Sequence, residues 1–393
     1  MSAEWAAGLT RAGELVAAAV RDGGVPGAVA AVGQGPVTLS GWVAGWAETS
    51  GGTAPANPPG KEGGTTPATA RPMTAGTLFD LASLTKVVAT TTAVLVLAGG
   101  GQLGLDDPAA RYLPGFTALR DGPVTIRHLL AHTSGLPDTR KFYQWCSSRE
   151  ELLRDLFTTS LQAPPGTRVT YSDLGFLALG EIVAGIAGEP LDTAIRDLVT
   201  GPLGMTSTGY IPLAETSRAA APDRFAATEP QEDGMPVSGV VHDENARLMG
   251  GVAGHAGLFS AVADLTAFCA WWVGDADVPV PAALRREAES GQTAGLGGSR
   301  GLGWVRGGDR LDILGGHWPA SAVSHTGFTG TSLALDSPSG VWAVLLTNSV
   351  HFGRDATAVK ALRRDFHAAV AAACRRSTGF PADSQARFLL LSY

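Results

Sequence analysis

Apolar and polar residues follow two different periods along the chain. Residues 27–46 alternate small apolar and polar positions around Gly33-Gln34-Gly35-Pro36, which predicts a β-hairpin. Short strand patterns return after residue 301, at 303–305, 322–325, 332–336 and 341–347, and Ser337-Pro338-Ser339-Gly340 forms the turn between the last two. The strand-forming segments therefore gather near the two ends of the chain.

Helical periodicity dominates the middle of the chain. Apolar spacing predicts helices at 84–97, 127–131, 149–157, 174–185, 191–198 and 263–272, with further helices at 1–20 and 355–375. We therefore expect an α/β (α+β) fold, in which an antiparallel sheet built from both termini is flanked by helices and carries an inserted all-helical domain. The expected limits are 1–85 and 275–393 for the sheet domain and 86–274 for the helical domain. The active site should lie in the cleft between them.

Two segments follow neither period. Residues 51–69 are rich in Gly, Pro and Thr and predict a long surface loop, and residues 138–148 predict a second one. We expect such loops to select the substrate.

Composition excludes several kinds of partner. The 393 residues are 45% hydrophobic and 17% charged, as in ordinary globular proteins, and the net charge of -7 provides no basic face for phosphates. We therefore expect neither nucleic acid nor a membrane surface as a partner. The first 20 residues lack the features of a signal peptide, and the apolar run at 87–97 is too short to span a bilayer. These observations predict a cytoplasmic protein.

The cysteines and histidines do not suggest a metal or a disulfide framework. Cys146, Cys269 and Cys374 are odd in number and widely spaced. His128 and His132 stand four residues apart but lack a carboxylate in the same turn. We expect three reduced thiols, no metal and no cofactor.

A serine followed by a lysine at i+3 is the first candidate for chemistry. In Ser83-Leu84-Thr85-Lys86, a helix would place Lys86 on the same face as Ser83, and a desolvated lysine can lose its proton and activate the hydroxyl. An arginine could not do so. Because the same spacing also arises by chance, the motif alone does not identify an enzyme.

Two later motifs add polar groups to the same predicted cleft. In Tyr171-Ser172-Asp173, just before a predicted helix, the tyrosine could relay protons, although a half-buried structural tyrosine is the simpler interpretation. In His325-Thr326-Gly327-Phe328, Gly327 permits close backbone approach and the Phe328 N–H could point at an oxyanion. His325 could orient or protonate a substrate, or it could serve packing alone.

A rival nucleophile occurs at Gly297-Gly298-Ser299-Arg300-Gly301, which formally matches the Gly-x-Ser-x-Gly elbow of α/β-hydrolases. No apolar strand precedes this segment and no helical pattern follows it. We interpret it as a glycine-rich loop.

Taken together, these motifs resemble the class C β-lactamase-like serine hydrolases, a family that also includes penicillin-binding-protein-like peptidases, esterases and transacylases. The resemblance runs through residues 79–86 (FDLASLTK), 124–137 (VTIRHLLAHTSGLP), Tyr171-Ser172-Asp173, 250–260 (GGVAGHAGLFS) and His325-Thr326-Gly327. It implies that Ser83 is the acylated nucleophile, Lys86 its base and Tyr171 a proton relay. It also implies an oxyanion hole formed by the N–H groups of Ser83 and Phe328.

The chain departs from the β-lactamases of this family at two positions. They have Asn in place of Asp173 and Lys in place of His325. Loss of a permanent cation and gain of an acid both weaken capture of a substrate carboxylate, which disfavours β-lactamase activity. The resemblance then implies the esterase and transacylase branch.

The sequence leaves the reaction partly open. We expect acyl transfer from a small-molecule ester or amide through a Ser83 acyl-enzyme, with water, an amine or an alcohol as the acceptor. The alternatives are a D-amino-acid peptidase or β-lactamase and, from another class, a catalytically silent binding protein of the same fold.

Overall fold

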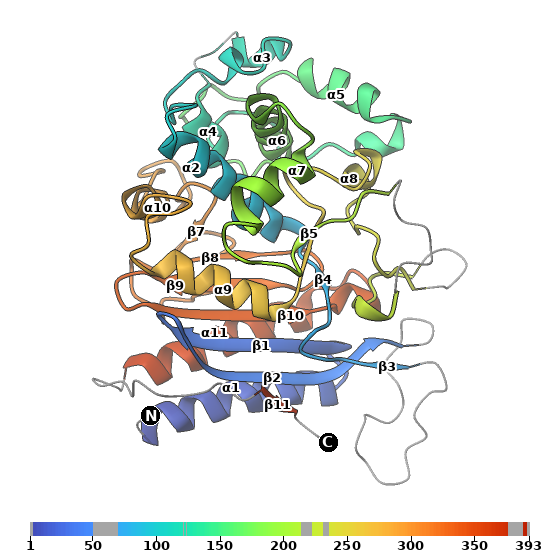
Figure 1. The fold of residues 1–393 in the computed structure, drawn as a ribbon, viewed down its shortest axis with the longest axis vertical. Coiled ribbons are helices and arrows are strands. Elements are labelled where there is room, and N and C mark those ends of the chain that lie inside the picture. Colours follow the sequence, from blue (N-terminus) through green and yellow to red (C-terminus); the bar gives the residue numbers. More distant parts are fainter. Residues whose placement is uncertain are drawn as a thin grey trace.

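The computed structural model describes residues 3–49, 70–120, 122, 124–213, 222–230, 236–375 and 388–390. The predicted loop at 51–69 lies outside the described residues. In Figure 1 a large sheet with helices on both faces occupies one half of the molecule, and most of the shorter helices occupy the other half.

The two ends of the chain meet in one sheet. Its strand order is β11-β2-β1-β10-β9-β8-β7, with β3 paired to β2 on the side. β1 pairs antiparallel with both β2 and β10, so that the N-terminal hairpin lies directly beside the C-terminal one, whereas β11 pairs parallel with β2. The strands are β1 (Gly27–Gln34), β2 (Val37–Glu48), β3 (Arg71–Pro72), β7 (Val305–Arg306), β8 (Val323–Thr326), β9 (Ser332–Asp336), β10 (Val341–Thr347) and β11 (Phe388–Leu390). The sheet built from both termini is confirmed.

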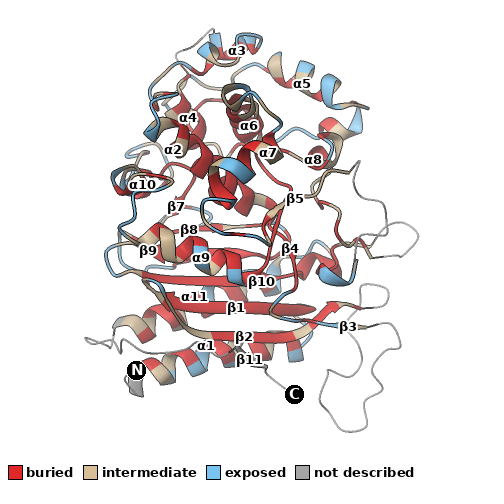
Figure 2. Ribbon diagram, viewed as in Figure 1, coloured by how far each residue is buried: buried red, intermediate tan, exposed pale blue. Residues whose placement is uncertain are grey.

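Both faces of this sheet are covered by helices. α1 (Ala3–Arg21) and α11 (Thr357–Arg375) pack against each other on one face, and α9 (Val262–Val273) packs on β1, β9 and β10 from the other face. β1 and β10 are consequently buried along most of their length (Figure 2). Successive side chains of β1 enter different cores, with Ala30 on the α1 and α11 side and Ala31 on the other. The predicted limits assigned α9 to the helical domain, although it packs on the sheet.

The remaining α-helices form a second region, and all of them except the last lie within the predicted helical limits of 86–274. They are α2 (Thr92–Gly99), α3 (Thr117–Arg120), α4 (Ile126–Leu130), α5 (Arg149–Phe157), α6 (Asp173–Ala187), α7 (Leu191–Ile195), α8 (Glu244–Leu248) and α10 (Ala282–Glu289). A small second sheet joins β4 (Phe79–Asp80), β6 (Leu258–Ser260) and β5 (Gly209–Tyr210) at the base of this region.

The predicted helix at 84–97 begins in a less regular way than expected. A 3₁₀ turn at Ala82–Leu84 and a π-helical segment at Lys86–Thr91 precede the α-helix α2. Together they form an 18-residue stretch, Ala82–Gly99, which is long and apolar enough to cross a membrane, contrary to the sequence estimate for 87–97. Since 78% of this stretch is buried inside the protein, it has the surroundings of a core helix.

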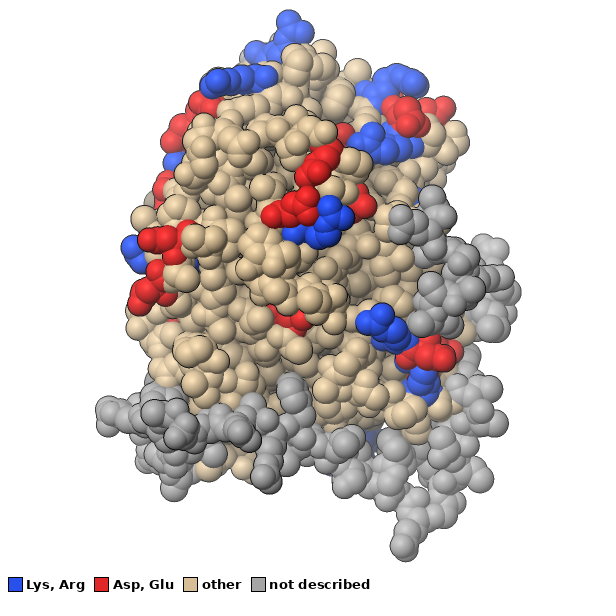
Figure 3. Space-filling view, in the orientation of Figure 1, with Lys and Arg blue, Asp and Glu red and all other residues tan. Residues whose placement is uncertain are grey.

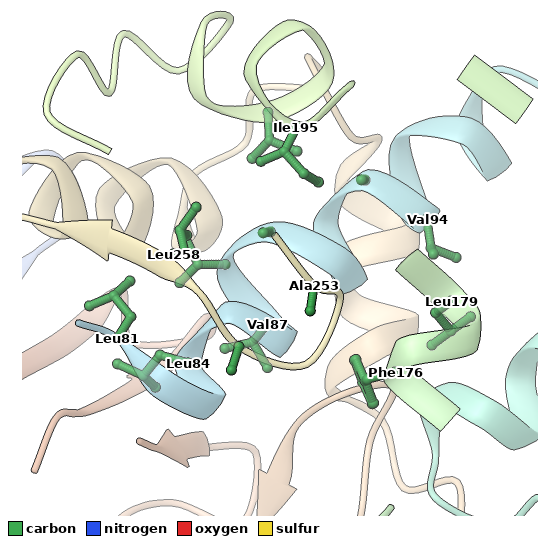
Figure 4. Close-up of a cluster of buried hydrophobic side chains, with 14 of the residues drawn as sticks. Leu81, Leu84, Val87, Val94, Phe176, Leu179, Ile195, Ala253 and Leu258 are labelled. Carbon is green, nitrogen blue, oxygen red and sulfur yellow. The ribbon is translucent and has the colours of Figure 1, made fainter. Parts of the chain in front are cut away.

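Apolar contacts fix this helix in the core. Figure 4 shows Val87 and Val94 on the side of Phe176 and Leu179 of α6, whereas Leu84 lies beside Leu81. Ile195, Ala253 and Leu258 complete the cluster. Each of these side chains is almost completely buried. On the face seen in Figure 3, charged side chains of both signs are intermixed in small groups. The apolar packing therefore holds the segment that carries Ser83.

Two glycines of α6 provide a test of this packing. A Cβ on Gly180 would lie 2.9 Å from the Gly254 Cα, whereas one on Gly185 would meet nothing within 4 Å. We expect Gly180→Ala to lower the free energy of unfolding by about 1–3 kcal/mol through overpacking. Gly185→Ala, the matched control, should raise it by up to about 1 kcal/mol because alanine favours the helix. Urea unfolding of both variants measures the difference, and equal effects would contradict the close helix-to-loop contact.

Candidate active site

A strained turn presents Ser83 at the edge of the small sheet. Ala82, just before it, has a φ of 45°, which is uncommon for a residue with a side chain. The buried Asp80 carboxylate supports this turn, because it accepts hydrogen bonds from the Ala82 N–H (2.8 Å) and the His242 N–H (2.6 Å). Burial raises the pKa of Asp80. Strain maintained in this way is typical of functional positions.

Lys86 connects three parts of the site through one ammonium group. Its Nζ lies 2.9 Å from Ser83 Oγ, 3.0 Å from the His255 carbonyl oxygen and 2.8 Å from Asp173 Oδ1. The Lys86 side chain is 0% exposed. The predicted contact between the serine and the lysine is therefore present.

The charge of Lys86 differs from the sequence expectation. Burial by itself would lower the pKa of this lysine, as expected from desolvation, but the Asp173 carboxylate and Tyr171 outweigh burial and raise the pKa above its ordinary value. Lys86 is therefore an ammonium at neutral pH. The expectation of a neutral lysine was wrong because it did not include an ion pair with Asp173.

Tyr171 lies within a ring of nitrogen-containing side chains. The centre of its ring is 5.1 Å from Lys86 Nζ, 4.6 Å from the His132 ring centre and 5.4 Å from the Arg300 guanidinium carbon. His132 also accepts a hydrogen bond from the Ser172 N–H at Nδ1 (3.0 Å), and burial together with Arg300 and Lys86 holds its pKa well below the usual range. Neutral His132 thus positions Ser172, which caps α6 and lies between Tyr171 and Asp173.

His325 faces Tyr171 from the end of β8, with the two ring centres 6.1 Å apart. Its Nδ1 lies 3.0 Å from the Thr326 carbonyl oxygen, which can only accept, so Nδ1 carries the proton. Burial, Lys86 and Arg300 lower the pKa of His325 well below its ordinary value. At neutral pH this position therefore has no positive charge.

The turn that follows β8 packs directly against the nucleophile turn. A Cβ on Gly327 would lie 2.3 Å from the Leu81 carbonyl oxygen, which confirms the predicted close approach. Buried hydroxyls join the two turns, since Thr329 Oγ1 donates to the Asp80 carbonyl (2.7 Å) and Thr331 Oγ1 donates to the Leu81 carbonyl (3.1 Å). These bonds hold the main chain around Ser83 and Phe328 in one frame.

Phe328 presents its ring to solvent beside this frame. The ring is 55% exposed and stacks on His242, with the ring centres 5.6 Å apart. No acceptor for the Phe328 N–H occurs among the described residues. The amides of Ser83 and Phe328 are therefore suitable donors to an oxyanion, as the resemblance implies.

The predicted loop at 138–148 borders the site. Its Asp138 carbonyl accepts a hydrogen bond from the Asp173 N–H (2.7 Å), and its Arg140 carbonyl accepts one from Asn245 Nδ2 of α8 (2.8 Å). This loop is thus hydrogen-bonded to the start of α6, where Asp173 lies.

The rival motif at 297–301 lies in the loop between α10 and β7, with no strand directly before it and no helix directly after it. The Ser299 N–H donates to Asp309 Oδ2 (3.0 Å), and the adjacent Arg300 forms a buried ion pair with the same carboxylate (2.8 Å). The segment therefore serves to hold Arg300 beside Tyr171.

Sequence reasoning missed four side chains that support the site, namely Asp80, Asp243, His255 and Arg300. His255 Nε2 lies 2.9 Å from Asp243 Oδ1, and although burial raises the pKa of Asp243, the contact with His255 keeps it well below its ordinary value. Only the position of Asp80, four residues before the predicted helix start at Leu84, provided a local signal. The other three act across long sequence separations.

Comparisons with known proteins agree with this geometry. The chain is 32% identical over 311 residues to a putative D-alanyl-D-alanine carboxypeptidase of Escherichia coli (strain K12), covering 71% of this chain and 70% of that protein. It is 32% identical over 308 residues to the N-acetylmuramyl-L-alanine amidase of Bacillus subtilis (strain 168), covering 70% and 68%. The structure of EstCE1, a hydrolase with promiscuous acyltransferase activity, matches 93% of this chain and 100% of its own with a TM-score of 0.71 at 23% identity, which shows a shared fold.

The model of the Beta-lactamase family matches residues 12–368, which is nearly the whole chain. The resemblance inferred from the motifs is thereby confirmed. This protein belongs to the Beta-lactamase family of serine hydrolases and acyltransferases.

Proposed function

We propose that this enzyme is a serine amidase that cleaves a muramyl-peptide amide through a Ser83 acyl-enzyme. The observation that carries the proposal is the position of Lys86 Nζ between Ser83 Oγ (2.9 Å) and Asp173 Oδ1 (2.8 Å). This arrangement gives the serine proton a continuous route to a carboxylate.

In acylation, Ser83 Oγ forms a bond to the amide carbonyl carbon and its proton passes to Lys86 Nζ. One of the ammonium protons passes at the same time to the Asp173 carboxylate, so Lys86 stays charged. The oxyanion accepts hydrogen bonds from the N–H groups of Ser83 and Phe328. When the C–N bond breaks, the proton returns through Lys86 and the Tyr171 hydroxyl to the leaving nitrogen.

Deacylation repeats these steps with water. Water gives its proton to the Lys86–Asp173 pair and attacks the ester carbon, and the returning proton restores the Ser83 hydroxyl as the C–O bond to serine breaks. An amine or alcohol in place of water would give transacylation by the same steps.

The charges at the cleft favour an internal amide over a C-terminal one. A carboxypeptidase or β-lactamase must bind a substrate carboxylate next to the oxyanion hole. Here His325 is neutral and Asp173 is an acid, so neither supplies a cation. Among the curated relatives, the activity of the Bacillus subtilis amidase suits this site better than a carboxypeptidase activity.

A cytoplasmic location stays a prediction from the sequence.

The substrate class can be tested with two peptides. We expect N-acetylmuramyl-L-alanyl-D-isoglutamine to be split at the muramyl amide, while a peptide ending in D-Ala-D-Ala should release no D-alanine. Mass spectrometry of products and of trapped enzyme detects each outcome, including the muramyl group on Ser83. Release of D-alanine alone would indicate a carboxypeptidase, and transfer to an added amine as the main reaction would indicate a transacylase.

The nucleophile assignment is tested by a pair of serine variants. Ser83→Ala should abolish turnover and labelling by a fluorophosphonate, because it removes the attacking oxygen. Ser299→Ala, the control for the rival motif, should keep wild-type kinetics. Loss of labelling in the second variant instead of the first would reverse the assignment.

The role of Asp173 is tested by Asp173→Asn and a pH series. Without the carboxylate, burial lowers the pKa of Lys86, and the serine proton must go to a lysine that has first lost its own proton. At pH 7 we expect kcat/KM to fall about tenfold or more and to recover as the pH rises. A variant faster than the wild type at pH 7 would show that Asp173 only suppresses Lys86 as a base.

A further inference from the structure

A buried arginine without an acidic partner among the described residues lies behind the turn after β8. This turn, residues 327–331, is called the oxyanion turn below. Arg363, on α11, is 6% exposed, and its Nη2 donates to the carbonyl oxygens of Gly327 (2.6 Å) and Thr331 (2.8 Å). No Asp or Glu among the described residues forms an ion pair with it. Its Nε is also buried and has no hydrogen-bond partner among the described residues.

The charge of Arg363 requires an explanation. Burial of a cation without a counterion is unfavourable, and a neutral side chain could close the same turn by donating hydrogen bonds. Burial lowers the pKa of Arg363 to about 10, so the guanidinium is still charged at neutral pH. The turn therefore lies next to a permanent positive charge.

The surroundings of Arg363 do not neutralise this charge. His367, one turn further along α11, has its pKa lowered to about 3 by burial and by Arg363, and its Nε2 lies 3.3 Å from Ser332 Oγ. His325, on β8, is also neutral, as described above. The field of Arg363 thus acts on the turn without screening by any side chain that the structure describes nearby.

The Gly327 carbonyl belongs to the same peptide group as the Phe328 N–H. This carbonyl accepts hydrogen bonds from Arg363 and from the Gly330 N–H (3.2 Å), while the N–H at the other end of the peptide has no acceptor in the described residues. A charged donor at the oxygen of an amide polarises the group and makes its N–H a stronger donor.

We infer that Arg363 is a positioning residue of the oxyanion hole, which orients and polarises the Gly327–Phe328 peptide so that its N–H stabilises the negative oxygen formed at Ser83. The inference rests on the acyl-enzyme of the proposed function and not on the muramyl substrate. It applies to any ester or amide that acylates Ser83.

The test compares Arg363→Gln, which retains a donor but loses the charge, with the exposed neighbour variant Arg364→Gln as control. The substrate is a p-nitrophenyl ester, so the result does not depend on the natural amide. We expect Arg363→Gln to lower kcat about tenfold or more with little change in KM, because the stabilisation appears only in the transition state. Arg364→Gln should behave as wild type.

An infrared measurement separates this role from a purely structural one. The carbonyl stretch of the Ser83 acyl-enzyme reports the strength of the oxyanion donors, and we expect it to move to higher wavenumber in Arg363→Gln and part of the way in Arg363→Lys. Unchanged rate and stretch with only a lower melting temperature would overturn the inference. If Arg363→Gln does not fold, Arg363→Lys carries the test, and a wild-type stretch at a reduced rate would overturn it.

Failure of the Arg363 inference can be distinguished from failure of the proposed muramyl substrate. A wild-type enzyme that forms the ester intermediate but leaves the muramyl amide intact would refute the substrate and keep the inference. Normal cleavage of the muramyl amide by Arg363→Gln would refute the inference and keep the substrate.

Discussion

The buried ammonium of Lys86 is the interaction on which the rest of the site depends. It lies where the nucleophile turn, the start of α6 and the loop before β6 converge, through its contacts with Ser83, Asp173 and the His255 carbonyl. A fully buried cation is stable only when its charge and its hydrogen bonds are satisfied. The position of Asp173 is therefore a structural requirement as well as a chemical one, and neighbouring groups are arranged to keep that position.

A second constraint acts on the main chain. The two proposed oxyanion donors come from segments more than 240 residues apart in sequence, Ser83 on one side and Phe328 on the other. Hydroxyls of Thr329 and Thr331 bind the Asp80 and Leu81 carbonyls, and Gly327 lets the two chains approach. Such short bonds between turns fix two amides more firmly than apolar packing alone, which is what preorganised stabilisation of an oxyanion requires.

The electrostatics of the cleft support the proposed preference for an internal amide. Histidines that might have been cations are neutral because burial and nearby Lys86 and Arg300 oppose protonation, as at His132 and His325. The two arginines near these turns are engaged by other groups of the protein. Arg300 forms an ion pair with Asp309, and Arg363 donates hydrogen bonds to main-chain carbonyls. The cleft thus stabilises charge that develops during the reaction and has little means of holding a substrate carboxylate.

The sequence by itself determined the layers of the fold and the residues of the central motifs. Periodicity identified the terminal strands and most helices because each element buries one face or stripe, and motif order singled out Ser83, Lys86 and Tyr171. Only the tertiary structure decided the charge of Lys86, the neutrality of His325, and the presence of Asp80, Asp243, His255 and Arg300 around them. A pKa depends on burial and on charges brought close by folding, and no local pattern reports which distant side chains meet. The same reason applies to Arg363, an unremarkable helical residue until α11 places it behind the oxyanion turn.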